Sequence, residues 1–251
     1  MVDLRGKLAV VTGGARDIGR AISLQLARCG ASVAFCYLAS AEHASKTADA
    51  MKQTGARVLA KRADVTKQKE VEAFMMAVCD TMRQPVDILV NNAGGLVARK
   101  RIEEMDETFW DSVIALNLKG TFLVTQAILP HMRDGGAIIN VSSQAARDGG
   151  GPGSLAYATS KGAILTFTRG LAKELGPRKI RVNAVCPGMT ATTFHDVFTK
   201  PDVRQRVASM TPLGREGEAQ EVAALVTYLA SSDASYVNGA AVDINGGILF
   251  S

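Results

Sequence analysis

The sequence predicts an α/β fold built on one doubly wound parallel sheet of about seven strands, with helices on both faces. Short apolar segments rich in β-branched residues alternate, along all 251 residues, with segments whose apolar residues recur at helical spacing. A glycine-rich turn, TGGARDIG at 12–19, follows the first apolar segment, as in Rossmann-type sheets. Because no Pro/Gly/Ser-rich linker or repeat divides the chain, we expect a single domain over residues 1–251.

The elements follow from these two periodicities. Strands are expected at residues 7–12, 32–38, 57–63, 86–91, 137–142, 181–186 and 241–244. Helices are expected at residues 18–29, 41–54, 68–82, 155–175 and 218–230, with further helices between them. Residues 189–215 show no clear pattern, and a loop of this length is usually a lid or a disordered segment.

Composition predicts a soluble, cytoplasmic protein. Hydrophobic residues make up 47% and charged residues 21% of the chain, and the apolar runs are shorter than the ~20 residues that span a bilayer. The N-terminus lacks the apolar segment of a signal peptide. The four cysteines form no CxxC pair, which favours reduced thiols and predicts no metal site.

The net charge of +5 permits several kinds of partner. The basic residues are scattered, and the runs KRADVTKQK and ARKR are interrupted or short. A solvated surface is therefore favoured over a nucleic-acid patch. A basic opening that attracts an anionic cofactor or substrate is a third interpretation.

The turn at 12–19 is suited to a pyrophosphate, because its glycines allow close backbone approach and the following helix presents free N–H groups. Asp17 stands where such turns usually have glycine. Aspartate is a favoured helix N-cap and tolerates positive φ, and Arg16 and Arg20 can offset its charge. We therefore expect the turn to keep its shape and to bind a dinucleotide.

Tyr157 and Lys161 lie four residues apart and share one helical face. A phenol has a pKa of ~10, and a nearby ammonium is expected to lower it, so that Tyr157 can exchange a proton with a carbonyl or alcohol oxygen. Ser143, at a strand end, can hold the same oxygen by a hydrogen bond. Taken alone, YxxxK is also an ordinary pattern of an exposed helix.

Over nearly its whole length the chain resembles the short-chain dehydrogenase/reductase family. The matching pieces are TGGARDIG, Asp64 after the third strand, NNAG at 91–94, Asn117 in ALNLKGTF, Ser143 in NVSS, YATSK at 157–161, VNAVCPG at 182–188 and DINGG at 243–247. Asp17 is the departure from the pattern within these pieces. The resemblance implies an NAD(P)-dependent oxidoreductase that acts on CH–OH and C=O groups, with Asn117, Ser143, Tyr157 and Lys161 as its catalytic residues.

The resemblance also implies roles around the cofactor. Lys161 would bind the nicotinamide ribose and Asn117 would support a water in a proton relay. Asp64 would bind the adenine amino group, and Thr192 the carboxamide. The full set of cofactor-binding residues implied is Gly13, Arg16, Asp17, Ile18, Gly19, Tyr37, Asp64, Val65, Asn91, Ala93, Gly94, Tyr157, Lys161, Pro187, Gly188, Thr190 and Thr192. For Asn91 and Asn92 a purely structural turn is an equal alternative.

The end of the second strand decides between NADP(H) and NAD(H). An acidic residue there binds the ribose 2′-hydroxyl and repels a 2′-phosphate. Tyr37 occupies that position, and Arg16 can pair with a 2′-phosphate. In contrast, Leu38 stands where many NADP-dependent relatives have a basic residue. We expect NADP(H) to be preferred and NAD(H) to remain possible.

Substrate choice is expected in the loops at 95–101, 144–154 and 189–215. They carry four basic residues that could meet an acidic substrate or simply be solvated: Arg99, Lys100, Arg147 and His195. NNAGGLVARK, GGGPGS and TTFHD also resemble the sub-group that reduces 4-deoxy-5-hexoseulose uronate to 2-keto-3-deoxygluconate. The alternatives are a 3-oxoacyl-(acyl-carrier protein) reductase and a non-catalytic dinucleotide sensor. The family commonly forms tetramers, and the apolar tail at 248–250 suits either a subunit contact or ordinary core packing.

Overall fold

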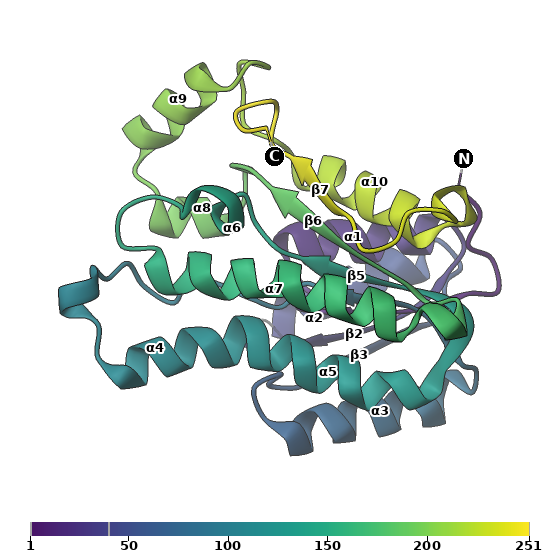
Figure 1. The fold of residues 1–251 in the computed structure, drawn as a ribbon. Coiled ribbons are helices and arrows are strands. Elements are labelled where there is room, and N and C mark those ends of the chain that lie inside the picture. Colours follow the sequence, from purple (N-terminus) through teal and green to yellow (C-terminus); the bar gives the residue numbers. More distant parts are fainter. Residues whose placement is uncertain (1, 40, 251) are drawn as a thin grey trace.

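The computed structural model describes residues 2–39 and 41–250, and its strands form one parallel sheet (Figure 1). The strand order is β3-β2-β1-β4-β5-β6-β7, and every neighbouring pair is parallel. The strands are β1 (Leu8–Thr12), β2 (Ser32–Tyr37), β3 (Val58–Arg62), β4 (Val86–Asn91), β5 (Met132–Val141), β6 (Arg181–Pro187) and β7 (Ala241–Ile244). The expected doubly wound sheet is confirmed.

Helices cover both faces of the sheet (Figure 1). One face packs against α1 (Asp17–Arg28), α2 (Ala41–Lys52) and α10 (Ala219–Ala230). The other packs against α3 (Gln68–Met82), α5 (Gly120–Ile128) and α7 (Leu155–Glu174). The central strands are buried on both faces, which explains their nearly continuous apolar sequence. The remaining helices are α4 (Glu107–Ile114), α6 (Ala145–Asp148), α8 (Thr193–Phe198) and α9 (Pro201–Met210), with short 3₁₀ or π segments η1 (Ile102–Glu104), η2 (Ala115–Lys119), η3 (Leu129–His131), η4 (Gly176–Arg178) and η5 (Ser232–Ala234).

Several predicted boundaries are wrong. β5 begins at Met132 rather than at residue 137, and α2 ends at Lys52 rather than at residue 54. The patternless stretch at 189–215 forms two helices, α8 and α9. None of their residues is fully buried, so no apolar stripe marked them in the sequence.

The continuous helical stretch from Glu107 to His131 is long and apolar enough to cross a membrane by length and composition. In this structure 44% of its most apolar window is buried, and its α5 part supplies Leu123, Val124 and Ile128 to the core beside the sheet. The stretch is apolar because it packs inside the molecule.

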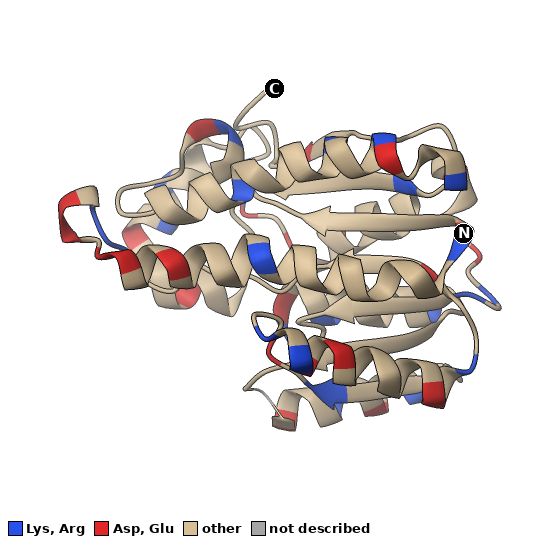
Figure 2. Cartoon of the chain, turned by 60° about the horizontal axis from the view of Figure 1, so that its bottom comes forward, with Lys and Arg blue, Asp and Glu red and all other residues tan. Residues whose placement is uncertain are grey.

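Charged residues of both signs are interspersed along the helices and loops (Figure 2). The strands that form the middle of the sheet are nearly free of them in the same view. This distribution agrees with a solvated surface, which the scattered basic residues favoured.

The order of the strands places a switch point between β1 and β4, where successive connections leave in opposite directions. Thr12 ends β1, and its side-chain oxygen accepts hydrogen bonds from the backbone N–H groups of Asn92 (3.0 Å) and Ala93 (2.9 Å), just beyond β4. The Asn92 amide donates in turn to the backbone oxygens of Thr12 (2.9 Å) and Gly13 (3.2 Å). These bonds fix the edge of the sheet at which ligands of such folds bind.

Candidate active site

The turn between β1 and α1 keeps the shape expected of a phosphate-binding turn. Gly13 has a φ of +65°, and a Cβ on Gly19 would lie 2.1 Å from the Gly13 oxygen. A Cβ on Gly14 would lie 2.6 Å from the Cβ of Phe35 on β2. The turn therefore needs these glycines for its own packing, and it presents backbone rather than side chains at the start of α1.

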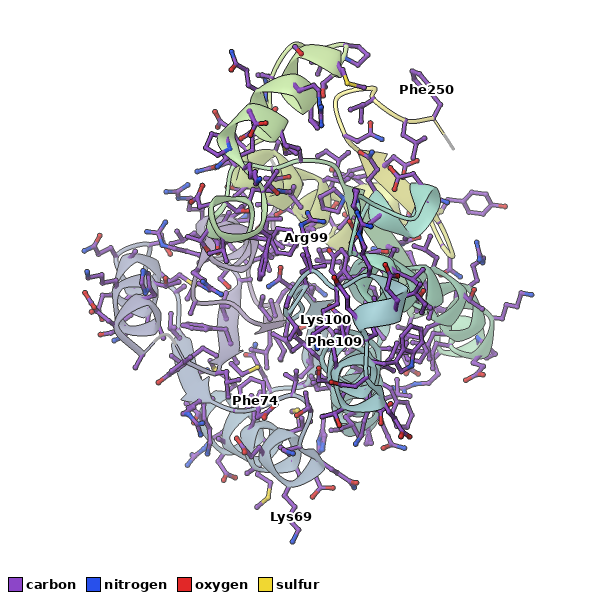
Figure 3. The ribbon with its side chains drawn as sticks, turned by 90° about the vertical axis from the view of Figure 1, so that its left-hand side faces the viewer. Lys69, Phe74, Arg99, Lys100, Phe109 and Phe250 are labelled. Atoms are coloured by element: carbon purple, nitrogen blue, oxygen red, sulfur yellow. The ribbon has the colours of Figure 1, made fainter. Side chains whose placement is uncertain are left out.

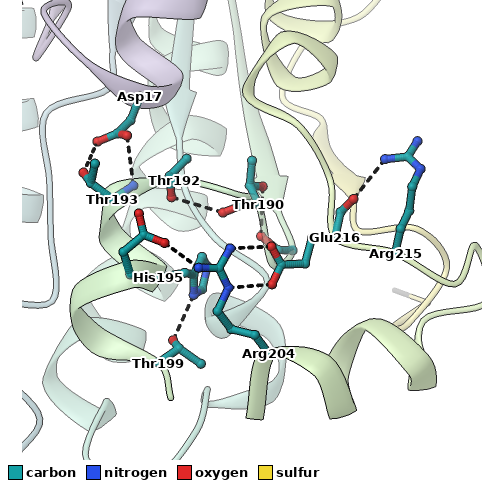
Figure 4. A network of polar contacts seen from close by, with 11 residues as sticks. Asp17, Thr190, Thr192, Thr193, His195, Thr199, Arg204, Arg215 and Glu216 are labelled. Atoms are coloured by element: carbon teal, nitrogen blue, oxygen red, sulfur yellow. Dashed lines mark hydrogen bonds and ion pairs between the residues drawn. The ribbon is translucent and has the colours of Figure 1, made fainter. Parts of the chain in front are cut away.

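Asp17 adopts the positive φ expected of it, +51°, but it is not the N-cap. Arg16 occupies the N-cap position of α1, without a side-chain capping bond. The Asp17 carboxylate instead accepts hydrogen bonds from the backbone N–H (3.0 Å) and the hydroxyl (2.5 Å) of Thr193 at the start of α8 (Figure 4). The carboxylate therefore connects two segments that are far apart in the sequence, since 176 positions separate Asp17 from Thr193.

Three of the four residues of the expected catalytic set lie just after β5 or in the first turns of α7. Lys161 is buried, and its Nζ donates to the backbone oxygen of Val141 (2.8 Å) and lies 5.8 Å from the centre of the Tyr157 ring. Ser143 follows β5, and its side chain is hydrogen-bonded to Tyr157. The structure thus brings Ser143, Tyr157 and Lys161 together, as the sequence predicted.

Asn117 lies in the π-helical segment between α4 and α5, and it is fully buried. Its side-chain oxygen accepts from the N–H of Gly95 (3.0 Å), and its amide donates to the oxygens of Gly95 (2.9 Å) and Val113 (3.0 Å). A Cβ on Gly94 would lie 2.6 Å from the Asn117 oxygen and 3.0 Å from the Lys161 nitrogen. Gly94 therefore leaves the space in which these two polar side chains lie, and π-helical turns are often found at such functional sites.

Burial dominates the pKa values of the tyrosine and lysine. It raises the pKa of Tyr157 above its ordinary value, and the hydrogen bond with Ser143 opposes that rise. Burial also lowers the pKa of Lys161 to about 8. The sequence led us to expect a lowered pKa for Tyr157, but in this structure burial raises it, and the opposing contribution comes from Ser143.

The residues expected around the adenosine lie at the carboxyl ends of β2, β3 and β4. Tyr37 ends β2, and Val65 is buried just beyond β3. Asp64 uses one carboxylate oxygen to accept from the N–H (2.9 Å) and hydroxyl (2.7 Å) of Thr66, which fixes its orientation. Ala93, also expected there, packs against the core on the α3 side.

Asn91 has a structural role that favours the alternative left open by the sequence. It is 3% exposed, and its amide donates to Thr125 (3.0 Å) and to Asn140 on β5 (2.9 Å). These bonds connect the sheet to α5. The side chain of Asn91 faces the core, so only its backbone atoms could contact a ribose directly.

The residues expected around the nicotinamide follow β6. A Cβ on Gly188 would lie 2.8 Å from the Cβ of Asn245 and 3.0 Å from the Gln144 side-chain oxygen, so only glycine fits after Pro187. Thr190 is buried, and its hydroxyl donates to the Gly188 oxygen (3.2 Å). The Thr192 hydroxyl donates to the Thr190 oxygen (3.1 Å). This segment leads directly into α8.

The four basic candidates for substrate binding differ in the residues that they contact. Arg147 pairs with Asp243 on β7 (3.3 Å) and donates to the Ala241 oxygen (3.0 Å), so β7 already engages its guanidinium. Lys100 lies 3.7 Å from an Asp106 carboxylate oxygen and 4.8 Å from the centre of the Phe109 ring (Figure 3). These contacts give both residues structural partners, which the sequence could not show.

Arg99 contacts the 189–215 segment, and His195 belongs to it. Arg99 donates to the backbone oxygens of Phe198 (2.9 Å) and Pro152 (2.9 Å), and thereby connects its own loop to the other two expected substrate loops. His195 contacts Thr199 through Nδ1 (3.0 Å), and burial lowers its pKa to about 4. His195 is therefore neutral at physiological pH and offers no positive charge to an acidic substrate.

Two features of the site carry no clear mark in the sequence. Thr193 lies within TTFHD, but that motif gives no sign that Thr193 is the partner of Asp17, and the unusual aspartate is the signal that could lead to it. Phe194 packs on the Tyr157 ring with 5.9 Å between centroids, and on Phe198 at 5.2 Å. The aromatic side chains of α8 thus form one wall beside Tyr157.

Comparison with known proteins identifies relatives of this chain. Residues 13–249 match a family model described as enoyl-(acyl carrier protein) reductase. The hydroxynaphthalene reductase-like protein Arp2 of Metarhizium brunneum is 37% identical over 97% of this chain and 95% of its own length. A short-chain dehydrogenase/reductase from Serratia marcescens is 38% identical over 98% of each chain, with a TM-score of 0.92. A blue fluorescent protein from a metagenomic library, solved with NADPH, is 35% identical over 99% of this chain and all of its own, with a TM-score of 0.93.

These matches span almost the whole chain. The chain belongs to the short-chain dehydrogenase/reductase family. It is an NAD(P)-dependent oxidoreductase.

Proposed function

We propose that the protein is an NADP(H)-dependent carbonyl reductase and alcohol dehydrogenase, with residues 1–251 as one dinucleotide-binding and catalytic domain and 189–215 as its substrate loop. The observation that supports this most is the space kept by Gly94 beside Asn117 and Lys161, next to the Ser143–Tyr157 hydrogen bond. A dinucleotide fits the same edge of the sheet, because the glycine turn presents backbone there and the N–H groups at the start of α1 have no side-chain cap.

The bound cofactor would supply the hydride, and this chain's residues would manage the oxygen and the proton. Ser143 and Tyr157 would hold the carbonyl oxygen, and Tyr157 would donate its proton as the alcohol forms. Lys161 would hold the nicotinamide ribose, and Asn117 would support the water from which the phenol regains its proton. The turn at 13–19, with Tyr37, Asp64, Val65 and Ala93, would hold the adenosine and pyrophosphate, and Pro187, Gly188, Thr190 and Thr192 the nicotinamide.

Preference for NADP(H) rests on the end of β2. Tyr37 stands there in place of an acidic residue that would repel a 2′-phosphate, and Arg16 is exposed in the glycine turn. The structural relative solved with NADPH supports the same preference. A kcat/KM ratio that favours NADH by more than about tenfold, ~1.4 kcal/mol, would contradict it.

For the substrate we propose a small acidic keto or aldehyde sugar, of which 4-deoxy-5-hexoseulose uronate is the model compound. Of the four basic candidates, Arg99 retains the best position, because it joins the loop after β4 to α8 and to the loop before α7. A guanidinium has five donors, and the two used by backbone oxygens leave others for a carboxylate.

A second candidate substrate is an aromatic ketone. The wall of Phe194 and Phe198 beside Tyr157 suits a flat apolar ring, and the Metarhizium relative is named as hydroxynaphthalene reductase-like. A 3-oxoacyl-(acyl-carrier protein) substrate is the further alternative, and the matched family model is described by an acyl-carrier-protein reductase.

NADPH consumption with a panel of carbonyls separates these candidates. The acidic substrate is supported if Arg99→Ala raises KM for the uronate much more than KM for a neutral aldehyde, because only the uronate loses a charged partner in addition to the contact that Arg99 makes with α8. Turnover of a polycyclic ketone or an acyl thioester supports one of the alternatives. Tight NADPH binding without turnover of any carbonyl would indicate a dinucleotide sensor instead of an enzyme.

We further propose a homotetramer in the cytoplasm. Phe250 is 87% exposed at the end of the tail (Figure 3), so core packing does not account for it, and Phe122 on α5 is 43% exposed. Such side chains are typical of subunit contacts. The four free thiols agree with a reducing compartment. Sedimentation that shows a monomer at working concentration would overturn the tetramer.

A further inference from the structure

Asp17 has an unusual place in the turn that would hold the pyrophosphate. Its φ of +51° is a conformation that favours glycine, and its carboxylate lies at the start of a helix, where a side chain normally caps free N–H groups. The carboxylate does not cap α1, since both of its oxygens accept hydrogen bonds from Thr193 (Figure 4). The N–H groups at the start of α1 are therefore left uncapped by side chains.

Helix α8, which Thr193 begins, is held at both ends. Asp17 accepts from its first residue, and Arg99 donates to the backbone oxygen of its last residue, Phe198, at 2.9 Å. Between these ends Phe194 packs on Tyr157. The position of α8 thus determines how an apolar wall lies against the catalytic tyrosine.

The middle of α8 is held by a further ion pair. Asp196 contacts the Arg204 guanidinium from α9, and that guanidinium also donates to both Glu216 oxygens at 2.7 and 2.6 Å (Figure 4). These contacts join α8 to α9 and to the chain that follows it. The link from α8 to the glycine turn, in contrast, is made by Asp17 together with Arg16, whose guanidinium donates to the Thr193 hydroxyl at 3.2 Å.

We propose that Asp17 is a positioning residue with two linked effects, a proposal that rests on the function proposed above. Its bonds to Thr193 hold α8 closed against Tyr157 and so order the wall of the substrate site. The same bonds, with Arg16 Nε 3.8 Å from one carboxylate oxygen, keep the negative charge engaged, so that the start of α1 can accept an anionic pyrophosphate. The aspartate is tolerated in the phosphate turn because Thr193 engages it.

The two effects predict opposite changes for the two ligands. Asp17→Gly removes the carboxylate and suits the positive φ, so the turn keeps its shape. We expect α8 to lose protection from hydrogen exchange and KM for the carbonyl to rise about tenfold, whereas the Kd for NADPH stays equal or falls. A merely structural residue would weaken both ligands and lower the melting temperature.

Further variants separate charge from hydrogen bonding. Asp17→Asn tolerates positive φ and keeps one acceptor oxygen, so α8 should remain partly held while NADPH binds at least as tightly. Thr193→Val removes one donor to the carboxylate, and we expect weaker NADPH binding, because the negative charge is less engaged. Thr193→Ser should restore it. Lys179→Gly, a matched change at another positive φ (+56°) on an exposed residue, should alter neither ligand.

The measurements are calorimetry for NADPH, hydrogen exchange over residues 193–198, and KM for the best carbonyl. Unchanged exchange in Asp17→Gly, or loss of affinity for both ligands in parallel, overturns the proposal. Exchange in the ligand-free protein tests the link between Asp17 and α8 without any activity. Failure of the wild type to bind NADPH or to reduce a carbonyl would overturn the proposed function separately.

Discussion

At the scale of single residues, Tyr157 tests the proposed chemistry most directly. Tyr157→Phe keeps the ring that packs on Phe194 and removes the hydroxyl that would donate the proton. We expect kcat to fall by ~10²–10⁴, the usual range for a general acid, with NADPH affinity unchanged. Tyr236→Phe is the matched control, because that side chain is fully exposed. A Tyr157→Phe enzyme that keeps a third of the wild-type turnover would show that another group donates the proton.

Gly94 offers a second test at this scale. A Cβ there would lie 2.6 Å from the Asn117 oxygen, closer than real contacts allow, so Gly94→Ala should displace Asn117, Lys161 or both. We expect at least about tenfold lower kcat, because ~1.4 kcal/mol of lost transition-state stabilisation is enough for that. Circular dichroism should show a retained fold.

Gly162→Ala is the control for this change. Gly162 is next to Lys161 on α7, but its added Cβ would lie 3.7 Å from the nearest atom, an ordinary contact. Equal turnover in the two variants would mean that the space beside Gly94 does not matter for catalysis.

At the scale of elements, α8 should give stability a dependence on pH. Burial lowers the pKa of His195 to about 4 in the folded protein, below the ordinary 6.5. Because the unfolded chain then binds more protons between these values, the contribution of neutral His195 is fully present above about pH 6.5 and is lost as pH falls toward 4. Glu216 changes in the same direction, since hydrogen bonds from Arg204 lower its pKa.

His195→Gln isolates the histidine from this behaviour. Glutamine cannot take up a proton, so the melting temperature of the variant should fall less than that of the wild type between pH 7.5 and pH 5. Thermal unfolding at the two values measures the difference. Parallel losses in both proteins would show that His195 is solvated at low pH and that Glu216 or other carboxylates account for the change.

At the scale of the whole molecule, stability and function are expected at opposite ends of the sheet. Asp87 lies near the amino end of β4, far along the strand from Asn91, and it is buried. Its carboxylate accepts from the Leu8 N–H (2.9 Å) and pairs with Lys7 (3.2 Å) and Arg133 (3.1 Å). These bonds tie together the ends of β1, β4 and β5.

Asp87→Ala should lower stability without changing the chemistry. Leaving the Leu8 N–H buried and unpaired costs ~1–3 kcal/mol, which lowers the melting temperature of a chain of this size by several degrees. Turnover per folded molecule should stay at the wild-type value. Asp111→Ala, at an exposed position of α4, is the control. A loss of kcat in Asp87→Ala at a temperature where it is folded would contradict this separation.

The parallel sheet and the group of residues at its centre can be predicted from the order of the amino acids alone. Buried strands read as continuous apolar segments, and glycine turns, NNAG and YATSK mark the strand ends and helix faces where ligands meet the chain. Such features depend on contacts between residues that are close in the sequence, or on the fact that the carboxyl ends of all parallel strands lie at the same edge of the sheet. For this reason the sequence is sufficient to place Gly13, Gly19, Ser143, Tyr157 and Lys161.

The partners of the polar side chains between these elements, in contrast, depend on how the chain folds in three dimensions. Arg147 pairs with Asp243, 96 positions away, and Asp17 with Thr193, 176 positions away. The helices at 193–210 are held by ion pairs of Arg204 with Asp196 and Glu216, 8 and 12 positions away, instead of by an apolar stripe, so no helical period in the sequence indicates them. The sequence shows which side chains carry charge or can form hydrogen bonds. It does not show their partners, because such an interaction needs the two groups to be close in space. Only the folded sheet determines which distant segments lie side by side.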